Sequence, residues 1–173
     1  MTVIQIAAAQ FALVFFPLLM VFAGAGDVMT ARIPNYFPVA MSVVFFPIAL
    51  ATGMPLLFFG LHIATAIVLL LVGFGLFSFG FIGGGDAKLM ASAGLWLGFP
   101  SALPFMLFSV LAGGVLAAAI GLLFMLNMEA GMRSVSLDKA LSRFKPSVPY
   151  GFALSAGAIL AIPFTWWMRV GAG

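Results

Sequence analysis

Two aspartates, Asp27 in "AGDVMTARIPNY" and Asp86 in "FIGGGDAKLM", are ionisable residues in a strongly apolar chain. Ionisable groups are costly inside a bilayer and usually have a function there. Two carboxylates that share a site hold a single proton between them. The ionised carboxylate can then take a proton from water while the protonated one polarises a peptide carbonyl. This chemistry hydrolyses a peptide bond without a metal ion or a covalent intermediate. The glycines before Asp86 would let substrate backbone and water come close.

Structural interpretations of the same residues remain open at this point. Asp86 could cap the helix that follows it, and Asp27 could cap a helix that starts in the next loop. The three glycines could form an ordinary loop, and Lys88 could extend to the lipid headgroups. A proton- or ion-coupling pair in a transporter is a further alternative.

The composition indicates a membrane protein with a single domain over residues 1–173. The chain is 65% hydrophobic and 6% charged, and a soluble domain of this length would need more polar surface. It has no cysteine and one histidine, His62, so thiolate and multi-histidine metal sites are excluded. The net charge of +3 is too small and dispersed to suggest nucleic-acid binding.

Apolar runs predict an all-α, polytopic fold with about six transmembrane helices, of which the fourth is the weakest. The first run lacks a preceding basic residue, so we expect a retained helix and not a cleaved signal peptide. The six runs cover residues 3–26, 36–51, 55–80, 87–103, 104–126 and 149–168.

The charges support this count, because six spans place six of the seven basic residues on one face. Only Arg169 lies opposite. The positive-inside rule makes the basic face cytoplasmic, and all four acidic residues lie there too. Asp27 and Asp86, 59 residues apart (86 − 27), therefore share one edge of the membrane and can meet if the first and fourth helices pack together. The basic residues of this face are Arg32, Lys88, Arg133, Lys139, Arg143 and Lys145.

The two motifs together resemble the type IV prepilin peptidases, which are membrane aspartyl proteases with a Gly-x-Gly-Asp motif. Within that resemblance, Asp27 and Asp86 match the two catalytic aspartates. The small size resembles the short form that serves tight-adherence (Flp) pilus systems. Ala31 departs from the pattern, since many members have a basic residue there. The supporting motif residues that match are Gly83, Gly85, Lys88, Arg32, Pro34, Asn35, Pro149 and Gly151.

The resemblance implies an aspartic-type endopeptidase of the bacterial inner membrane, multi-pass, with its active site facing the cytoplasm. It implies cleavage of the leader peptide of Flp-type prepilins, with a prepilin-like protein and membrane lipids as partners and no nucleic acid. No cofactor or metal is expected. The missing cysteines imply peptidase activity without methyltransferase activity. The alternative is a small membrane transporter or pilus-assembly subunit that uses Asp27 and Asp86 as a proton or ion site.

Two further features are weaker. "SVSLDKALSRFK" predicts either a short amphipathic helix on the cytoplasmic surface or a charged loop. His62 lies near the external side of the third run, so we expect a buried or interfacial polar residue far from the aspartates.

Overall fold

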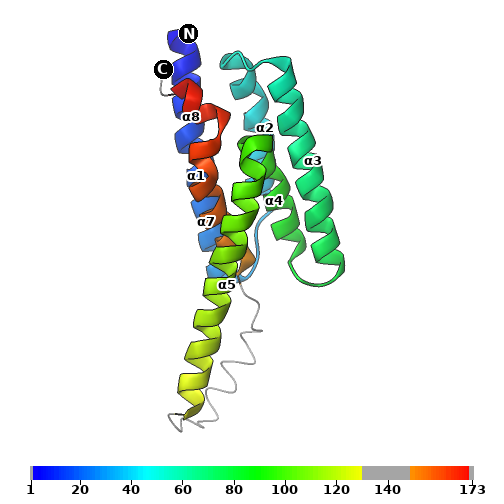
Figure 1. Ribbon diagram of the computed structural model, residues 1–173, viewed down its shortest axis with the longest axis vertical. Coiled ribbons are helices and arrows are strands. Elements are labelled where there is room, and N and C mark those ends of the chain that lie inside the picture. The colour runs from blue at the N-terminus through cyan, green and yellow to red at the C-terminus, as the bar shows by residue number, and fades with distance from the viewer. Residues whose placement is uncertain (1, 130–148, 172–173) are drawn as a thin grey trace.

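The computed structural model describes residues 2–129 and 149–171, and every regular element in those ranges is a helix (Figure 1). The amphipathic segment proposed above lies outside the described residues. The elements in chain order are α1 (Val3–Thr30), α2 (Tyr36–Ala51), α3 (Leu56–Ser78), α4 (Gly84–Leu97), α5 (Phe99–Glu129), α7 (Tyr150–Ala161), the 3-10 turn η1 (Ile162–Phe164) and α8 (Trp166–Gly171).

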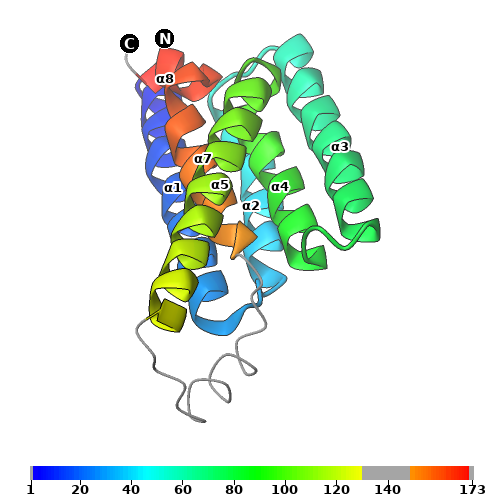
Figure 2. The ribbon, with the colours of Figure 1, turned by 60° about the horizontal axis from the view of Figure 1, so that its bottom comes forward.

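The helices run alternately up and down, so that the turns fall into two groups. Figure 1 shows both termini and the α2–α3 turn at one end, and the α1–α2 and α3–α4 turns at the other. Helix α7 packs between α1 and α5 and also contacts α4, while α3 packs on the outer side of α4 (Figure 2). The two aspartate-containing segments therefore reach the same end of the bundle, as the topology predicts.

The all-α membrane fold is confirmed. Within residues 2–129 and 149–171, three helical segments are long and apolar enough to cross a bilayer, namely Val3–Thr30, Leu56–Ser78 and Phe99–Leu123. Two shorter apolar segments, Tyr36–Ala51 and Tyr150–Phe164, accompany them. The outer surface carries large exposed apolar side chains, as a lipid-facing surface requires. The count of six spans stays a prediction.

Several predicted boundaries were wrong. The first helix continues to Thr30 instead of ending at residue 26, so Asp27 lies within α1. The fourth ends at Leu97 instead of residue 103, and Pro104 lies inside α5 instead of starting it. The last run is divided by the turn η1, which contains a proline that cannot continue the hydrogen bonds of α7.

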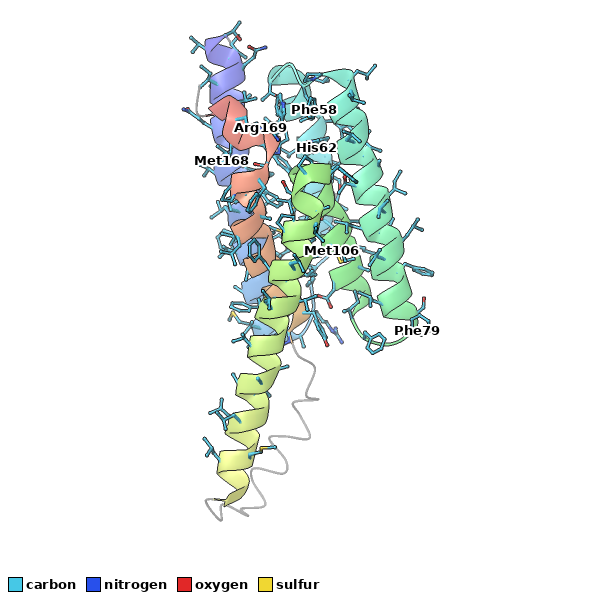
Figure 3. All side chains as sticks on the ribbon, in the orientation of Figure 1. Phe58, His62, Phe79, Met106, Met168 and Arg169 are labelled. Atoms are coloured by element: carbon cyan, nitrogen blue, oxygen red, sulfur yellow. The ribbon has the colours of Figure 1, made fainter. Side chains whose placement is uncertain are left out.

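Gly98 explains the break between α4 and α5. Its φ of +72° is favourable only for glycine, and a Cβ atom there would lie 2.7 Å from the His62 ring. His62 itself is buried, at 2% exposed, and its Nδ1 lies 2.7 Å from the Leu95 carbonyl. Figure 3 shows His62 at the opposite end of α3 from Phe79, which adjoins the α3–α4 turn. The histidine is thus a buried polar residue far from the aspartates, as expected.

Candidate active site

Asp27 lies in the last turn of α1 and is buried, with 7% of its surface exposed. Its Oδ2 accepts a hydrogen bond of 2.8 Å from the backbone N–H of Gly151, in the first turn of α7. The first-turn amides of a helix lack partners within the helix, so this carboxylate caps α7 from another helix. The alternative in which Asp27 caps a helix of the next loop is therefore wrong.

Asp86 is the third residue of α4 and is also 7% exposed. Its Oδ2 accepts a hydrogen bond of 2.9 Å from the N–H of Gly83, the residue that precedes α4. A carboxylate at this position commonly returns to the N-cap amide in this way. Among the described residues, however, its Oδ1 is a buried oxygen without a hydrogen-bond partner. Capping therefore accounts for one oxygen of Asp86 and leaves the other unexplained.

The two carboxylates influence each other electrostatically. Asp86 precedes the apolar part of α4, and its pKa is raised to about 6, chiefly because burial disfavours the charged form. The hydrogen bond from Gly83 opposes this shift, and the charge of Asp27 adds to it. Below about pH 6 Asp86 therefore holds a proton, and the charge of Asp27 helps to retain it.

Glycines make these arrangements possible. A Cβ atom on Gly83 would lie 3.1 Å from Asp86 Oδ2, and one on Gly85 would lie 3.1 Å from Ile33 Cβ. On Gly151 it would lie 2.9 Å from Asp27 Oδ2. The neighbours that these glycines admit are thus the chain's own carboxylates and Ile33. The expectation that they admit substrate or water remains a prediction.

Comparison with known protein families shows which family the chain belongs to. The model of the type IV leader peptidase family matches residues 14–118, more than half of the sequence and both aspartates. The chain belongs to this family. No match was found among curated proteins or among solved structures. Gly151, which holds Asp27, lies beyond the matched residues.

The remaining motif residues of this peptidase surround the same end of the bundle. Lys88 Nζ donates a hydrogen bond of 2.9 Å to Asn35 Oδ1, which ties the α1–α2 turn to α4. The Pro34 carbonyl accepts from the Phe37 N–H (3.2 Å) at the start of α2. Pro149 precedes α7, and its carbonyl accepts from the N–H of Phe152 (3.1 Å). Arg32 is exposed on the turn.

Lys88 points away from the aspartates. Residues two apart on a helix differ by about 200° in direction, so Lys88 and Asp86 lie on opposite sides of α4. The Lys88 side forms the floor of an apolar groove of about 600 Å³ between α2 and α3, and Asn35 also lines it. The groove and the aspartates are therefore separate features, and Lys88 supports the turn without touching the carboxylates.

Two features of this region were not predicted from the sequence, namely the role of Ser155 and the place of Ile33. Ser155 Oγ lies 2.5 Å from the Met20 carbonyl and 2.7 Å from that of Gly151, which fastens α7 to α1 beside Asp27. Its spacing of four from Gly151 on a small-residue helix face is a signal that could have found it. The second is Ile33, which lies between Gly85 and Gly151. Only the folded chain brings these two glycines together.

The described residues contain no group of three or more histidine, cysteine, aspartate or glutamate side chains that could hold a metal ion. Within the part of the chain that the structure describes, Asp27 and Asp86 are the two buried carboxylates.

Proposed function

We propose that this peptidase is an aspartic-type endopeptidase that removes the leader peptide of type IV prepilins of the Flp type. Asp27 and Asp86 are its catalytic residues. The observation that carries the proposal is the Asp86 carboxyl group, which is buried, responds to the charge of Asp27, and has no partner at Oδ1 among the described residues. A buried oxygen without a partner is costly, and such groups occur where they act on a substrate.

The pair would work by sharing one proton. The ionised carboxylate takes a proton from water, and the oxygen of that water attacks the scissile carbonyl carbon. The protonated carboxylate gives its proton to the carbonyl oxygen, so that a neutral tetrahedral intermediate forms. As this intermediate collapses, the C–N bond breaks, the leaving nitrogen takes a proton from the first carboxylate, and the second recovers its own. Because the pair titrates as a unit, the roles belong to the pair.

The charge distribution supports an active site at the cytoplasmic face of the bacterial inner membrane. Arg32 and Lys88 lie at the aspartate end, and Figure 3 shows Arg169 at the other end. The positive-inside rule assigns the end with the two basic residues to the cytoplasm. A prepilin anchored in the bilayer by its apolar helix would present its leader there.

The test is co-expression with a candidate Flp-type prepilin, followed on a gel that resolves the precursor from the shorter mature form. Wild type should shorten the precursor. Asp27→Asn and Asp86→Asn should each lower cleavage by at least about 100-fold while still inserting into the membrane. Asp138→Asn makes the same chemical change at the third aspartate of the chain and should cleave as wild type does.

Unchanged cleavage by both Asn variants would contradict the proposal. Processing that persists while a proton or ion flux is lost would favour the transporter alternative instead.

A further inference from the structure

Ile33 occupies the space between the two glycines that accompany the aspartates. A Cβ atom on Gly85 would lie 3.1 Å from Ile33 Cβ and 3.2 Å from the Ile33 carbonyl oxygen. A Cβ atom on Gly151 would lie 2.7 Å from Ile33 Cδ1. All three distances are shorter than ordinary packing contacts, so the isoleucine packs closely against α4 on one side and α7 on the other.

Each of these glycines supports one carboxylate. Gly85 directly precedes Asp86 in the first turn of α4, and the N–H of Gly151 holds Asp27 Oδ2. The backbone and Cβ of Ile33 therefore face Gly85, which precedes Asp86. Its Cδ1 faces Gly151, whose N–H binds Asp27. One side chain thus separates the two elements that determine where the carboxylates lie.

The turn that carries Ile33 is itself fixed. Ala31 ends α1 in the left-handed conformation (φ 51°), with its N–H bonded to the Asp27 carbonyl at 2.8 Å. Pro34 restricts the backbone of the preceding Ile33 to extended conformations, and β-branching restricts its χ1. The hydrogen bond from Lys88 to Asn35 holds the far side of the turn against α4. Ile33 is therefore a stiff side chain on a constrained turn.

We propose that Ile33 is a positioning residue that sets the separation of Asp27 and Asp86 by acting as a spacer between Gly85 and Gly151. The proposal rests on the proposed function, since its measurable consequence is in cleavage by the aspartate pair. Shortening the spacer lets α4 and α7 move closer together, which misplaces the carboxylates and strengthens the influence of each charge on the other.

The first experiment compares Ile33→Ala with Ile48→Ala, which makes the same truncation at a partly buried isoleucine near the other end of α2. Cleavage of a prepilin is measured with equal amounts of folded protein across pH 5 to 8. Ile33→Ala should lower kcat about tenfold or more with little change in KM. It should also move the alkaline limit of activity to higher pH, because a closer Asp27 charge raises the upper pKa of the pair more. Ile48→Ala should leave the pH profile unchanged.

A second experiment combines glycine variants with a smaller change at residue 33, and it tests the proposal even if Ile33→Ala does not fold. Gly85→Ala and Gly151→Ala should each reduce kcat. Adding Ile33→Val, which removes only Cδ1, should restore part of the loss in Gly151→Ala. The rescue is partial because the new methyl group also meets Asp27. The same valine should restore nothing in Gly85→Ala, because valine keeps the Cβ and carbonyl that Gly85 contacts.

Equal rescue of both glycine variants, or an Ile33→Ala pH profile identical to wild type, would overturn the spacer role. If Asp86→Asn, measured in the same series, abolishes cleavage while the Ile33 variants behave as Ile48→Ala does, only this inference fails. If Asp86→Asn still cleaves, the proposed function fails, and the spacer role with it.

Discussion

The two ends of α4 differ in how their side chains are packed and hydrogen-bonded. The last turn carries Trp96, whose ring packs against Phe16 (5.8 Å between centroids), Phe45 (5.8 Å) and Trp167 (5.6 Å) from three other helices. Its Nε1 donates to the Met41 carbonyl at 2.9 Å. The first turn instead has glycines and Asp86, with a buried oxygen that has no partner among the described residues.

Within one helix of 14 residues, one end therefore contributes to the stability of the bundle and the other carries the candidate catalytic group. Large, bonded aromatic groups stabilise the bundle at one end of α4. A buried and incompletely bonded carboxylate costs stability at the other, and such a cost is typical of functional sites. Substitutions at the two ends should therefore affect different measurements.

The largest effect is expected from Trp96→Ala. Removing this side chain leaves a cavity among four helices and should lower the free energy of unfolding by about 3–5 kcal/mol, measured by denaturation in detergent micelles. Asp86→Asn should change it by no more than about 1 kcal/mol, because the asparagine oxygen can still accept from Gly83. A larger loss of stability from Asp86→Asn than from Trp96→Ala would contradict the division between the two ends.

The second prediction concerns pH. Because the pKa of Asp86 is raised to about 6, its proton is retained below that pH and lost above it. The cleavage rate should therefore fall as the pH rises through 6, by about tenfold per unit once well above it. Melting curves at each pH serve as the control for unfolding. A constant cleavage rate between pH 5 and 8 would show that no shared proton is needed.

A third test compares two glycines of α1 close to Asp27. A Cβ atom on Gly24 would lie 2.6 Å from Ser155 Oγ, whereas one on Gly26 would meet nothing within 4 Å. Gly24→Ala should thus cost about 1–3 kcal/mol of stability by separating α1 from α7. Gly26→Ala should be neutral or stabilising by up to about 1 kcal/mol. Equal effects in denaturation would mean that the close crossing of α1 and α7 is not required.

The smallest effect is expected at Ala31, which has a positive φ of 51°. Ala31→Gly relieves this strain but makes the unfolded chain more flexible, so the net gain should be below about 1 kcal/mol. Ala64→Gly, inside α3, should instead lose about 1 kcal/mol. The prediction fails if Ala31→Gly destabilises the protein as much as Ala64→Gly does.

Much of this arrangement could be predicted from the sequence because hydropathy and charge are local properties. Apolar runs gave the all-α fold and the bounds of α2, and the distribution of basic residues placed Asp27 and Asp86 at one end. The pairing of the two motifs is supported by the Lys88–Asn35 hydrogen bond between them.

What could not be predicted depends on contacts between distant residues. The break at Gly98 follows from the packing of His62 against it, and the capping of α7 joins Asp27 to Gly151, 124 residues away. The place of Ile33 depends on three helices that meet only after folding. A sequence pattern contains no direct signal for such contacts.

The most direct test of the central claim is cleavage by the purified chain alone, in liposomes, with a synthetic Flp-type prepilin and mass detection of the released leader. We predict one released leader peptide with wild type and none with Asp27→Asn or Asp86→Asn, while both variants keep the wild-type melting temperature within a few degrees (about 1 kcal/mol or less). Release of the same leader by either variant at a rate near that of wild type would contradict the claim that these two aspartates form the catalytic pair.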